Sequence, residues 1–258
     1  MPLDDSADLE LRRIHTFLSA FSRRQSERTI DFPGGFAALN DTYALSRGDN
    51  HVLVDGDPDP EALPALVDTV LAALPHRAVY IPDETVAAAC AGPLAHAGYT
   101  RQTVVVMVHR GPLPELGGAR EVGLPALRGP LAESWRRFLP DVSDEVIHDL
   151  VERRTARLRG ADDVRFLASH DEFGQVASWA DLYLDPATGI AQIEDLVTAE
   201  PYLGQGHAGV VLDTALRSAA AAGCRTVFLM ALADDWPRHW YERRGFVALG
   251  EVQCFERA

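Results

Sequence analysis

A run of glycines between a strand pattern and a helix pattern constrains the fold of this chain more than any other feature. Its residues are Leu203-Gly204-Gln205-Gly206-His207-Ala208-Gly209. Glycine adopts backbone conformations that other residues avoid, so successive backbone N–H groups can turn toward one point. The N-terminus of a helix adds the positive end of its dipole, and such a point binds anions, a pyrophosphate best of all. A plain tight turn is the alternative interpretation of a glycine run this short.

The residues around this run predict a definite order of elements. Ser143 precedes an amphipathic pattern and predicts a capped helix. Three strands then form an antiparallel meander, and the glycine run is followed by a crossover helix ending at Gly223, a parallel strand, a short helix and a last strand. The predicted strands are 164–169, 175–184, 190–198, 226–232 and 246–255, and the short helix is 236–244.

The first half of the chain repeats the later part of this order. Its predicted strands are 51–55, 78–81 and 103–108, and its predicted helices are 60–74 and 84–97. The similar spacing of Gly98 and Gly245 from the strands before them suggests an internal duplication, although coincidence of common β-α-β units is the alternative. The Pro- and Gly-rich stretch 110–118 has the composition of a linker, which predicts a domain boundary near residue 120.

Composition and charge limit the possible functions. The formal net charge is −14, and all 24 basic residues are arginine. An acidic chain without a basic stripe repels phosphate backbones, which argues against nucleic-acid binding, whereas a cationic small molecule would be attracted. Simple solubility is the alternative explanation of the charge.

Cysteine and histidine spacing gives no indication of a metal site or a disulfide framework. Cys90, Cys224 and Cys254 are scattered and predict reduced core thiols, and the histidines lack metal-ligand spacing. The start of the chain, Met1–Asp5, is acidic rather than basic as in a signal peptide, and no window has the apolar length of a membrane helix. We therefore expect a cytoplasmic protein that contacts no membrane.

Two elements of the second half resemble the GNAT acyltransferase superfamily. That family carries (Gln/Arg)-x-x-Gly-x-(Gly/Ala), then a helix, a strand and a (Leu/Phe)-Tyr-x-x-x-Gly-Phe ending. The matching residues are Leu203-Gly204-Gln205-Gly206-His207-Ala208 and Trp240-Tyr241-Glu242-Arg243-Arg244-Gly245-Phe246. The resemblance covers roughly residues 121–256, and the first half is similar to a degenerate copy in a tandem protein.

Three positions depart from the family pattern. Leu203 stands where the family usually has Gln or Arg, so only backbone groups can serve the phosphates there. Asp234 stands where the family often has Asn in contact with the cofactor arm. The first-half loop Asp55-Gly56-Asp57-Pro58-Asp59-Pro60 carries three carboxylates, which repel phosphate, and two prolines, which lack N–H donors. One cofactor per chain is therefore expected, in the second half.

The resemblance also implies roles for individual residues. The pantetheine arm of the cofactor is expected to run beside Leu196-Val197-Thr198, where that strand separates from 226–232, although Leu196 and Val197 also suit ordinary sheet core. Glu194 matches a general base acting through water, and Tyr241 matches a general acid near the thioester sulfur.

Each of these side chains has a structural alternative. Glu194 could be a solvated carboxylate, and Tyr241 could pack against Phe246. In a regular strand Asp195 would point to the face opposite Glu194. Asp234, Asp235 and Trp236 could form an acidic, aromatic rim for a cation or, more simply, a helix N-cap.

Together, the residues and the resemblance imply an α/β protein with a mixed, mostly antiparallel twisted sheet flanked by helices, in two GNAT-like halves: a degenerate domain over 1–120 and a catalytic acetyl-CoA-binding domain over 121–258. The expected activity is transfer of an acetyl group from acetyl-CoA (coenzyme A) to a primary amine of a small, cationic molecule, by direct attack in a ternary complex. A monomer or a homodimer is expected. Two alternatives stay open: a non-catalytic acyl-CoA-binding or sensing module, and another acyl-CoA chemistry such as decarboxylation.

Overall fold

The computed structural model describes residues 5–258, so most of the acidic start Met1–Asp5 lies outside it. The chain forms two compact units. The first comprises the residues up to Met107 together with Met230–Glu242 and Ala248–Ala258, and the second comprises Val108–Leu229 with Arg243–Val247. The chain thus changes unit after residues 107, 229, 242 and 247. The predicted boundary near residue 120 stays a prediction.

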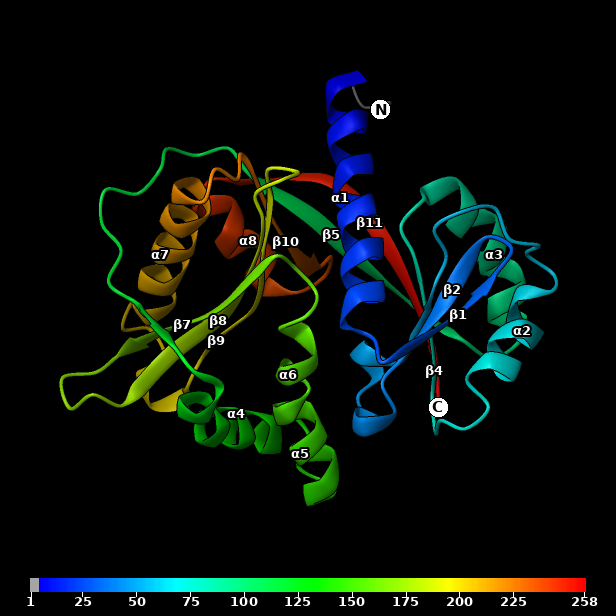
Figure 1. Cartoon of the computed structure of the whole chain (residues 1–258), viewed down its shortest axis with the longest axis horizontal. Helices are drawn as coiled ribbons and strands as arrows, with labels where there is room; N and C mark the ends of the chain where they lie inside the picture. The colour runs from blue at the N-terminus through cyan, green and yellow to red at the C-terminus, as the bar shows by residue number, and fades with distance from the viewer. Residues whose placement is uncertain (1–4) are drawn as a thin grey trace. The chain divides into compact units, whose positions relative to one another are not determined.

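The first unit contains the first three helices and the first five strands. They are α1 (Asp5–Gln25), β1 (Arg28–Phe32), β2 (Gly35–Leu39), η1 (Asp41–Tyr43), η2 (Arg47–Asp49), β3 (His51–Leu53), α2 (Leu63–Val70), β4 (Arg77–Ile81), α3 (Glu84–His96) and β5 (Thr100–His109) (Figure 1). Near the end of the chain follow α8 (Trp236–Arg243) and β11 (Phe246–Arg257), most residues of which belong to this unit.

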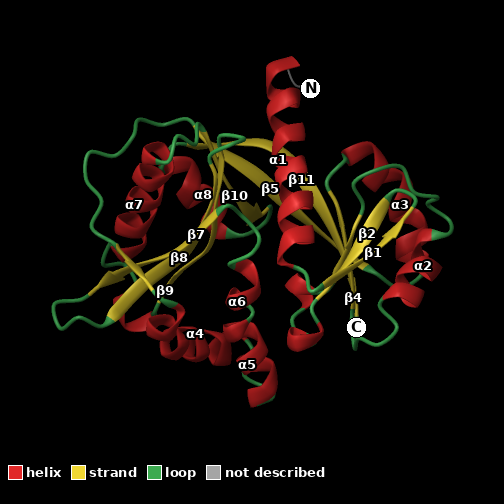
Figure 2. Ribbon diagram, in the orientation of Figure 1, coloured by secondary structure: helices red, strands yellow, loops and turns green. Residues whose placement is uncertain are grey.

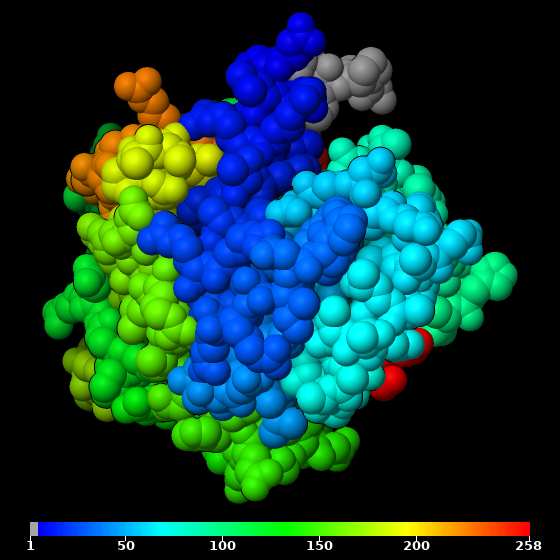
Figure 3. Space-filling model, turned by 45° about the vertical axis from the view of Figure 1, so that its right-hand side comes forward, coloured from blue at the N-terminus to red at the C-terminus, as the bar shows by residue number. Residues whose placement is uncertain are grey.

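The strands of the first unit run in the order β1-β2-β3-β4-β11-β5. The β1–β2, β2–β3 and β4–β11 pairs are antiparallel, and β3–β4 is parallel. Side chains of α2 and α3, including Leu63, Val67 and Leu94, pack against the sheet around Val79 and Phe255. Helix α1 buries Ile14, Phe17 and Phe21 and leaves its other side on the surface, where Figure 3 shows it in blue.

The second unit contains the meander and the glycine run. Its elements are β6 (Arg120–Val122), α4 (Leu124–Phe138), α5 (Asp144–Glu152), α6 (Arg154–Arg157), β7 (Asp163–His170), β8 (Val176–Asp185), β9 (Ile190–Thr198), η3 (Glu200–Tyr202), α7 (His207–Ala221) and β10 (Thr226–Leu232), the last of which ends in the first unit.

The sheet of the second unit runs in the order β10-β9-β8-β7-β6. The β6–β7, β7–β8 and β8–β9 pairs are antiparallel, and β9–β10 is parallel. Helix α7 packs on one face of β7, β8 and β9, and α4 lies on the other side of these strands (Figure 2). A core around Leu127, Leu131, Phe166 and Trp179 fills the space between α4, α5 and the sheet. The predicted α/β architecture, with a mostly antiparallel twisted sheet flanked by helices, is confirmed.

Most of the predicted elements occur near their predicted bounds. Strands β9 and β10 match exactly, Ser143 caps α5 by accepting from the Val146 backbone N–H, and Gly223 follows α7 with a positive φ of 82°. The helix predicted over 60–74 is shorter, because α2 comprises only Leu63–Val70. Helices α1 and α4 and strands β1, β2 and β6 were not predicted.

The predicted linker 110–118 is tied to the second unit. The Arg217 guanidinium donates to the backbone oxygens of Pro114 (2.9 Å) and Glu115 (2.8 Å). The Thr214 hydroxyl accepts from the backbone N–H groups of Gly118 and Ala119, each at 3.0 Å. This stretch therefore lies along α7 as an anchored strap.

Both units contain a parallel strand pair connected by a helix. In the first, β3 and β4 are connected by α2, and in the second, β9 and β10 are connected by α7. Each pattern continues with a helix, a glycine of positive φ (Gly98, 86°; Gly245, 87°) and a strand. These shared features support the duplication as a proposal. No helix among residues 5–258 is long and apolar enough to cross a membrane.

Candidate acyl-transfer site

The glycine run forms an open loop at the N-terminus of α7. Gly204 and Gly206 have φ values of 75° and 88°, and nothing lies within 4 Å of where a Cβ would stand on either residue. The side-chain amide of Gln205 donates to the Pro201 carbonyl oxygen (2.8 Å), which holds the loop against the preceding 3-10 turn. The Leu203 side chain is 60% exposed, so it contributes no core packing.

The first turn of α7 presents backbone donors. His207, Ala208 and Gly209 are the first helical residues, so their N–H groups have no acceptor within the helix. The N-cap residue is Gly206, which has no side chain to cap this N-terminus. At Gly209 a Cβ would stand 3.4 Å from a guanidinium nitrogen of Arg244, which is itself paired with Asp213 at 2.6 Å. The loop is therefore shaped to bind an anion through its backbone.

Strand β9 loses its partner on one side before it ends. Its pairing with β10 runs from Ile190↔Thr226 to Ile193↔Leu229, whereas its pairing with β8 continues to Thr198. The residues Leu196-Val197-Thr198 therefore lie beyond the paired part of the β9–β10 ladder, with main-chain groups that an extended ligand can bind.

A β-bulge at Asp195 corrects the expectation that its side chain points away from Glu194. The β8–β9 register shifts between Trp179↔Val197 and Asp181↔Glu194, which leaves an extra residue on β9, and Asp195 has a positive φ of 50°. The bulge breaks the alternation of side chains along the strand. Asp195 consequently reaches the arginines that also bind Asp181, the cross-strand partner of Glu194.

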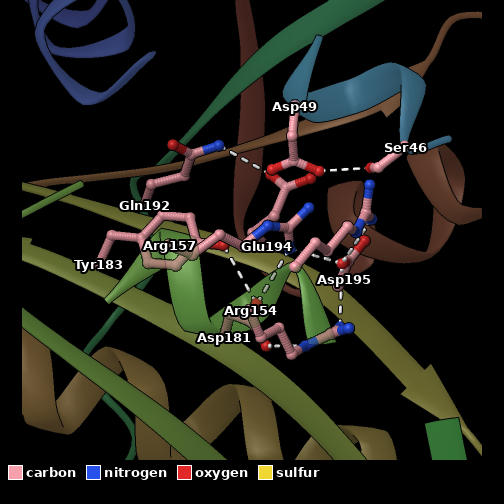
Figure 4. Close-up of polar contacts among 10 residues, drawn as sticks. Ser46, Asp49, Arg154, Arg157, Asp181, Tyr183, Gln192, Glu194 and Asp195 are labelled. Atoms are coloured by element: carbon pink, nitrogen blue, oxygen red, sulfur yellow. Dashed lines mark hydrogen bonds and ion pairs between the residues drawn. The ribbon is translucent and has the colours of Figure 1, made fainter. Parts of the chain in front are cut away.

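These carboxylates and arginines form a buried ionic cluster (Figure 4). Arg154 donates from Nε to Asp181 (2.9 Å) and from Nη2 to Asp195 (2.9 Å). Arg157 Nη1 donates to both Asp181 (3.0 Å) and Asp195 (2.7 Å), and Arg153 reaches Asp195 at 3.4 Å. The Tyr183 hydroxyl donates to Asp181 at 3.1 Å.

The cluster separates the pKa values of its two neighbouring acids. Burial and the charge of Asp195 raise the pKa of Glu194 to about 7, and the Gln192 amide donates to its carboxylate at 2.7 Å. Burial alone would raise the pKa of Asp195, but Arg157, Arg154 and Arg153 outweigh it and hold that pKa well below its usual range. Asp195 therefore stays ionised, while Glu194 exchanges a proton near neutral pH.

A pocket of about 250 Å³ lies beside this cluster. Its lining is mainly aromatic and aliphatic, with one hydroxyl and one ion pair. The lining residues are Leu131, Ser134, Trp135, Phe138, Arg154, Trp179, Asp195 and Val197. A small ligand in this pocket would lie next to Asp195, the residue that follows Glu194 on β9.

The remaining predicted residues, Asp234 and Tyr241, belong to the first unit. Tyr241 on α8 is buried and its ring meets that of Trp240 edge-on at 5.2 Å, while Phe246 packs on His109 at 5.1 Å. Asp234 is exposed, and the Asp235 carboxylate accepts from the Trp236 backbone N–H at 2.8 Å. This last contact joins neighbouring residues at the start of α8.

Sequence reasoning missed most of the ionic cluster and the pocket. Arg153, Arg154 and Arg157 share one side of a helical turn, and Asp181 falls within a mainly apolar strand. A carboxylate in such a strand needs a buried cation, so this pattern could have indicated the cluster.

Removal of the Asp181 charge is expected to destabilise the second unit. Asp181 is fully buried and accepts from two arginines, so Asp181→Asn leaves buried positive charge uncompensated. We expect the free energy of unfolding to fall by about 3–5 kcal/mol in urea denaturation. Glu152→Gln, which breaks a pair with the half-exposed Arg128, should cost no more than about 1 kcal/mol. Equal losses in the two variants would contradict a structural role of the cluster.

Comparison with protein families identifies residues 130–246 as matching the acetyltransferase (GNAT) family. This range includes α5, the meander, the glycine loop, α7 and Tyr241. No curated protein matches the chain.

Solved structures share the fold over nearly the whole chain. A GCN5-related N-acetyltransferase from Kribbella flavida aligns with a TM-score of 0.63 at 15% identity, covering 95% of this chain and 94% of its own. A functionally unknown conserved protein from Staphylococcus epidermidis gives 0.64 at 14% identity, covering 89% and 93%. A GNAT-family acetyltransferase from Colwellia psychrerythraea gives 0.53 at 15%, covering 100% and 98%. At these identities the likeness concerns the fold alone.

Proposed function

We propose that this chain, whose residues 130–246 match the GNAT acetyltransferase family, transfers an acetyl group from acetyl-CoA to a primary amine of a small molecule. The observation that carries the proposal is the coincidence, in one unit, of an uncapped glycine loop with a carboxyl group whose pKa is raised to about 7. The amine arrives as an ammonium cation, which the acidic chain attracts.

The loop and the free edge of β9 would hold the cofactor. The backbone N–H groups of Leu203–Gly209 would bind the pyrophosphate, and Leu196-Val197-Thr198 would pair with the pantetheine arm through main-chain hydrogen bonds. Asp234 would contact the same arm. Acetyl-CoA supplies an acyl group activated as a thioester.

Two side chains would move the protons. Glu194 accepts a proton from the ammonium through water, which frees the nitrogen lone pair to attack the thioester carbonyl. As the C–N bond forms and the C–S bond breaks, Tyr241 donates a proton to the departing sulfur. The products are the amide, the free thiol of CoA and one proton released to solvent.

A screen of thiol release tests this proposal. Acetyl-, propionyl-, malonyl- and succinyl-CoA would each be combined with amino acids, polyamines and aminoglycosides. Amine-dependent release from acetyl-CoA supports the proposal. Thiol release or loss of CO₂ without any amine would favour another acyl-CoA chemistry, and CoA binding without any turnover would favour a sensing module.

Gly206→Val should abolish the protection that CoA gives against thermal unfolding. A ligand that binds only the folded chain raises its stability by RT ln(1 + [L]/Kd), and a branched side chain at Gly206 would occupy the open space where the phosphates are expected. Gly223→Val is the matched control, because Gly223 has a similar φ of 82° and equally open surroundings at the far end of α7. The control should lose stability yet keep the shift in Tm with CoA. If the Gly206→Val variant also keeps the shift in Tm with CoA, the loop is not the phosphate site.

Calorimetry is expected to give one CoA per chain. In the first unit the loop Asp55–Pro60 carries three carboxylates that repel phosphate, and one of its backbone donors is already used: the Gly56 N–H donates to the Gly34 oxygen at 3.1 Å. The prolines at 58 and 60 supply no further donors. A stoichiometry near two would overturn the interpretation of the first half as a degenerate copy.

A further inference from the structure

One side of α4 lines the pocket beside the ionic cluster. Leu131, Ser134, Trp135 and Phe138 belong to it, and their spacing of three and four residues places them on the same side of the helix. Exposure increases along this side, from 2% at Leu131 to 69% at Phe138. The pocket therefore opens to solvent near the last turn of α4, where the Trp135 and Phe138 rings stand 6.4 Å apart.

Strands β8 and β9 form the other wall of the pocket. Trp179 and Val197 pair across these strands, and Asp195 lines the same wall. The Asp195 carboxylate is already engaged, because it accepts from Arg154 (2.9 Å) and Arg157 (2.7 Å), and Arg154 also lines the pocket (Figure 4). A charged ligand group would lose its hydration and compete with these ion pairs. The lining therefore favours an uncharged, apolar group.

The volume of the pocket limits the size of that group. It holds about 250 Å³. An apolar cavity of roughly 150 Å³ stays free of water and binds benzene, whereas pockets for drug-sized ligands measure roughly 300–1,000 Å³. The space beside α4 thus suits one aromatic ring or one branched alkyl group. A sugar-sized polar group would leave its hydroxyls facing Leu131, Trp135 and Val197.

The pocket and the glycine loop lie on opposite faces of the meander. Helix α7, which begins at the loop, packs on one face of β7, β8 and β9, whereas α4 lies on the other (Figure 2). A cofactor whose pyrophosphate binds at the loop reaches the free edge of β9 from the α7 face, and its acetyl group is far smaller than the pocket. The apolar group therefore belongs to the acceptor, which approaches from the α4 face.

We propose that the acceptor is a primary amine with one aromatic or branched alkyl group, such as phenethylamine or 3-methylbutylamine, and that this group occupies the pocket. The identity of the acceptor rests on the proposed acyl transfer, whereas binding of the apolar group rests on the pocket alone. The amine then lies outside the pocket, on the side of Asp195 and the adjoining Glu194, which takes its proton. The nitrogen attacks the thioester carbonyl as the C–S bond breaks.

NMR titration with alcohols in the absence of any acyl-CoA tests the pocket itself. 2-Phenylethanol and 3-methylbutanol carry the two candidate groups without an amine, and ethanol lacks both groups. We expect at least one of the two to bind about 10- to 100-fold more tightly than ethanol, as burial of such a group provides. 4-(2-Hydroxyethyl)benzoate adds a carboxylate to the ring and should bind at least about 10-fold more weakly than the better alcohol. The proposal is overturned if neither alcohol binds more tightly than ethanol, or if the benzoate binds as tightly as the better alcohol.

Two substitutions on α4 locate the place where the alcohols bind. Ser134 lines the pocket and is partly exposed, so Ser134→Phe puts a ring into the space proposed for the ligand without removing core atoms. This variant should bind the alcohols at least about 10-fold more weakly and keep the shift in Tm with CoA. Glu133→Phe adds the same ring at the neighbouring, exposed position outside the lining and should bind the alcohols as wild type does. Wild-type affinity in the Ser134→Phe variant, or an equal loss in the Glu133→Phe variant, would show that the pocket is not the binding site.

Acyl-transfer kinetics separate this inference from the proposed function. We expect kcat/KM for phenethylamine or 3-methylbutylamine to exceed that for ethylamine by about 10- to 100-fold. Binding of the alcohols without amine-dependent thiol release would refute only the acyl transfer, and acetylation with equal kcat/KM for all three amines would refute only the identity of the acceptor. Faster use of phenylacetyl-CoA than of acetyl-CoA with ethylamine, if lost in the Ser134→Phe variant, would assign the pocket to the acyl group and overturn the proposal.

Discussion

Glu194→Gln is expected to lower kcat by about 100- to 10,000-fold, the usual effect of losing a general base. The wild-type rate should rise with pH through about 7, where Glu194 loses its proton, and this acidic limb should be absent from the variant. Gln can still accept from the Gln192 amide, so the geometry of β9 is retained. Steady-state kinetics over a range of pH values provides the measurement.

A second measurement on the same variant checks the raised pKa directly. The folded chain binds the Glu194 proton more tightly than the unfolded chain, whose carboxyl has a pKa of 4.5. Between pH 4.5 and about 7 the folded state therefore holds more protons, and wild-type stability falls as pH rises through this window. Glu194→Gln should lack that fall. Glu172→Gln, in an exposed turn, should match wild type in both rate and pH dependence. A Glu194 variant with near-wild-type turnover of the true acceptor would exclude the base role.

The fold was predictable where apolar periodicity and glycines marked the elements together. Strands β9 and β10 have their predicted bounds because turns flank both of them. Gly206 and Gly223 mark the two ends of α7. Helix α4 was missed because Pro125 and Pro130 interrupt its sequence, although the first lies in its opening turn, where proline is tolerated. Leu127, Leu131 and Trp135 are each four residues apart, and this helical spacing could have predicted α4.

The candidate site was less predictable because it depends on a local departure from regular structure. Strict alternation places Asp195 opposite Glu194, yet the bulge and its positive φ direct Asp195 to the arginines of α6 and the turn before it. In this conformation Asp195 accepts from Arg154 and Arg157. The pocket likewise requires α4 to be placed over Trp179 and Val197, which is a tertiary arrangement with no local sequence pattern.

Tyr241→Phe is expected to lower kcat by about 100- to 10,000-fold while leaving the Kd for CoA nearly unchanged. The hydroxyl would act on negative charge that develops at sulfur only as the thioester breaks, so its loss affects the transition state and not the bound cofactor. Tyr241 is buried, and its ring packs edge-on with Trp240, a contact that Phe preserves. Calorimetry with CoA and steady-state kinetics separate the two effects.

The matched control for this change is Tyr99→Phe. Tyr99 is also buried in the first unit, and its hydroxyl has no partner among the described residues, so the same deletion there should leave turnover unchanged. If loss of a buried hydroxyl acted only through packing, both variants would lose a similar, small amount of activity. A soluble, folded Tyr241→Phe variant with near-wild-type kcat would exclude the acid role, because this variant lacks only the hydroxyl that is proposed to donate the proton. Together with an inactive Glu194→Gln, that result would favour direct protonation of the thiolate by water, with Glu194 alone moving a proton within the protein.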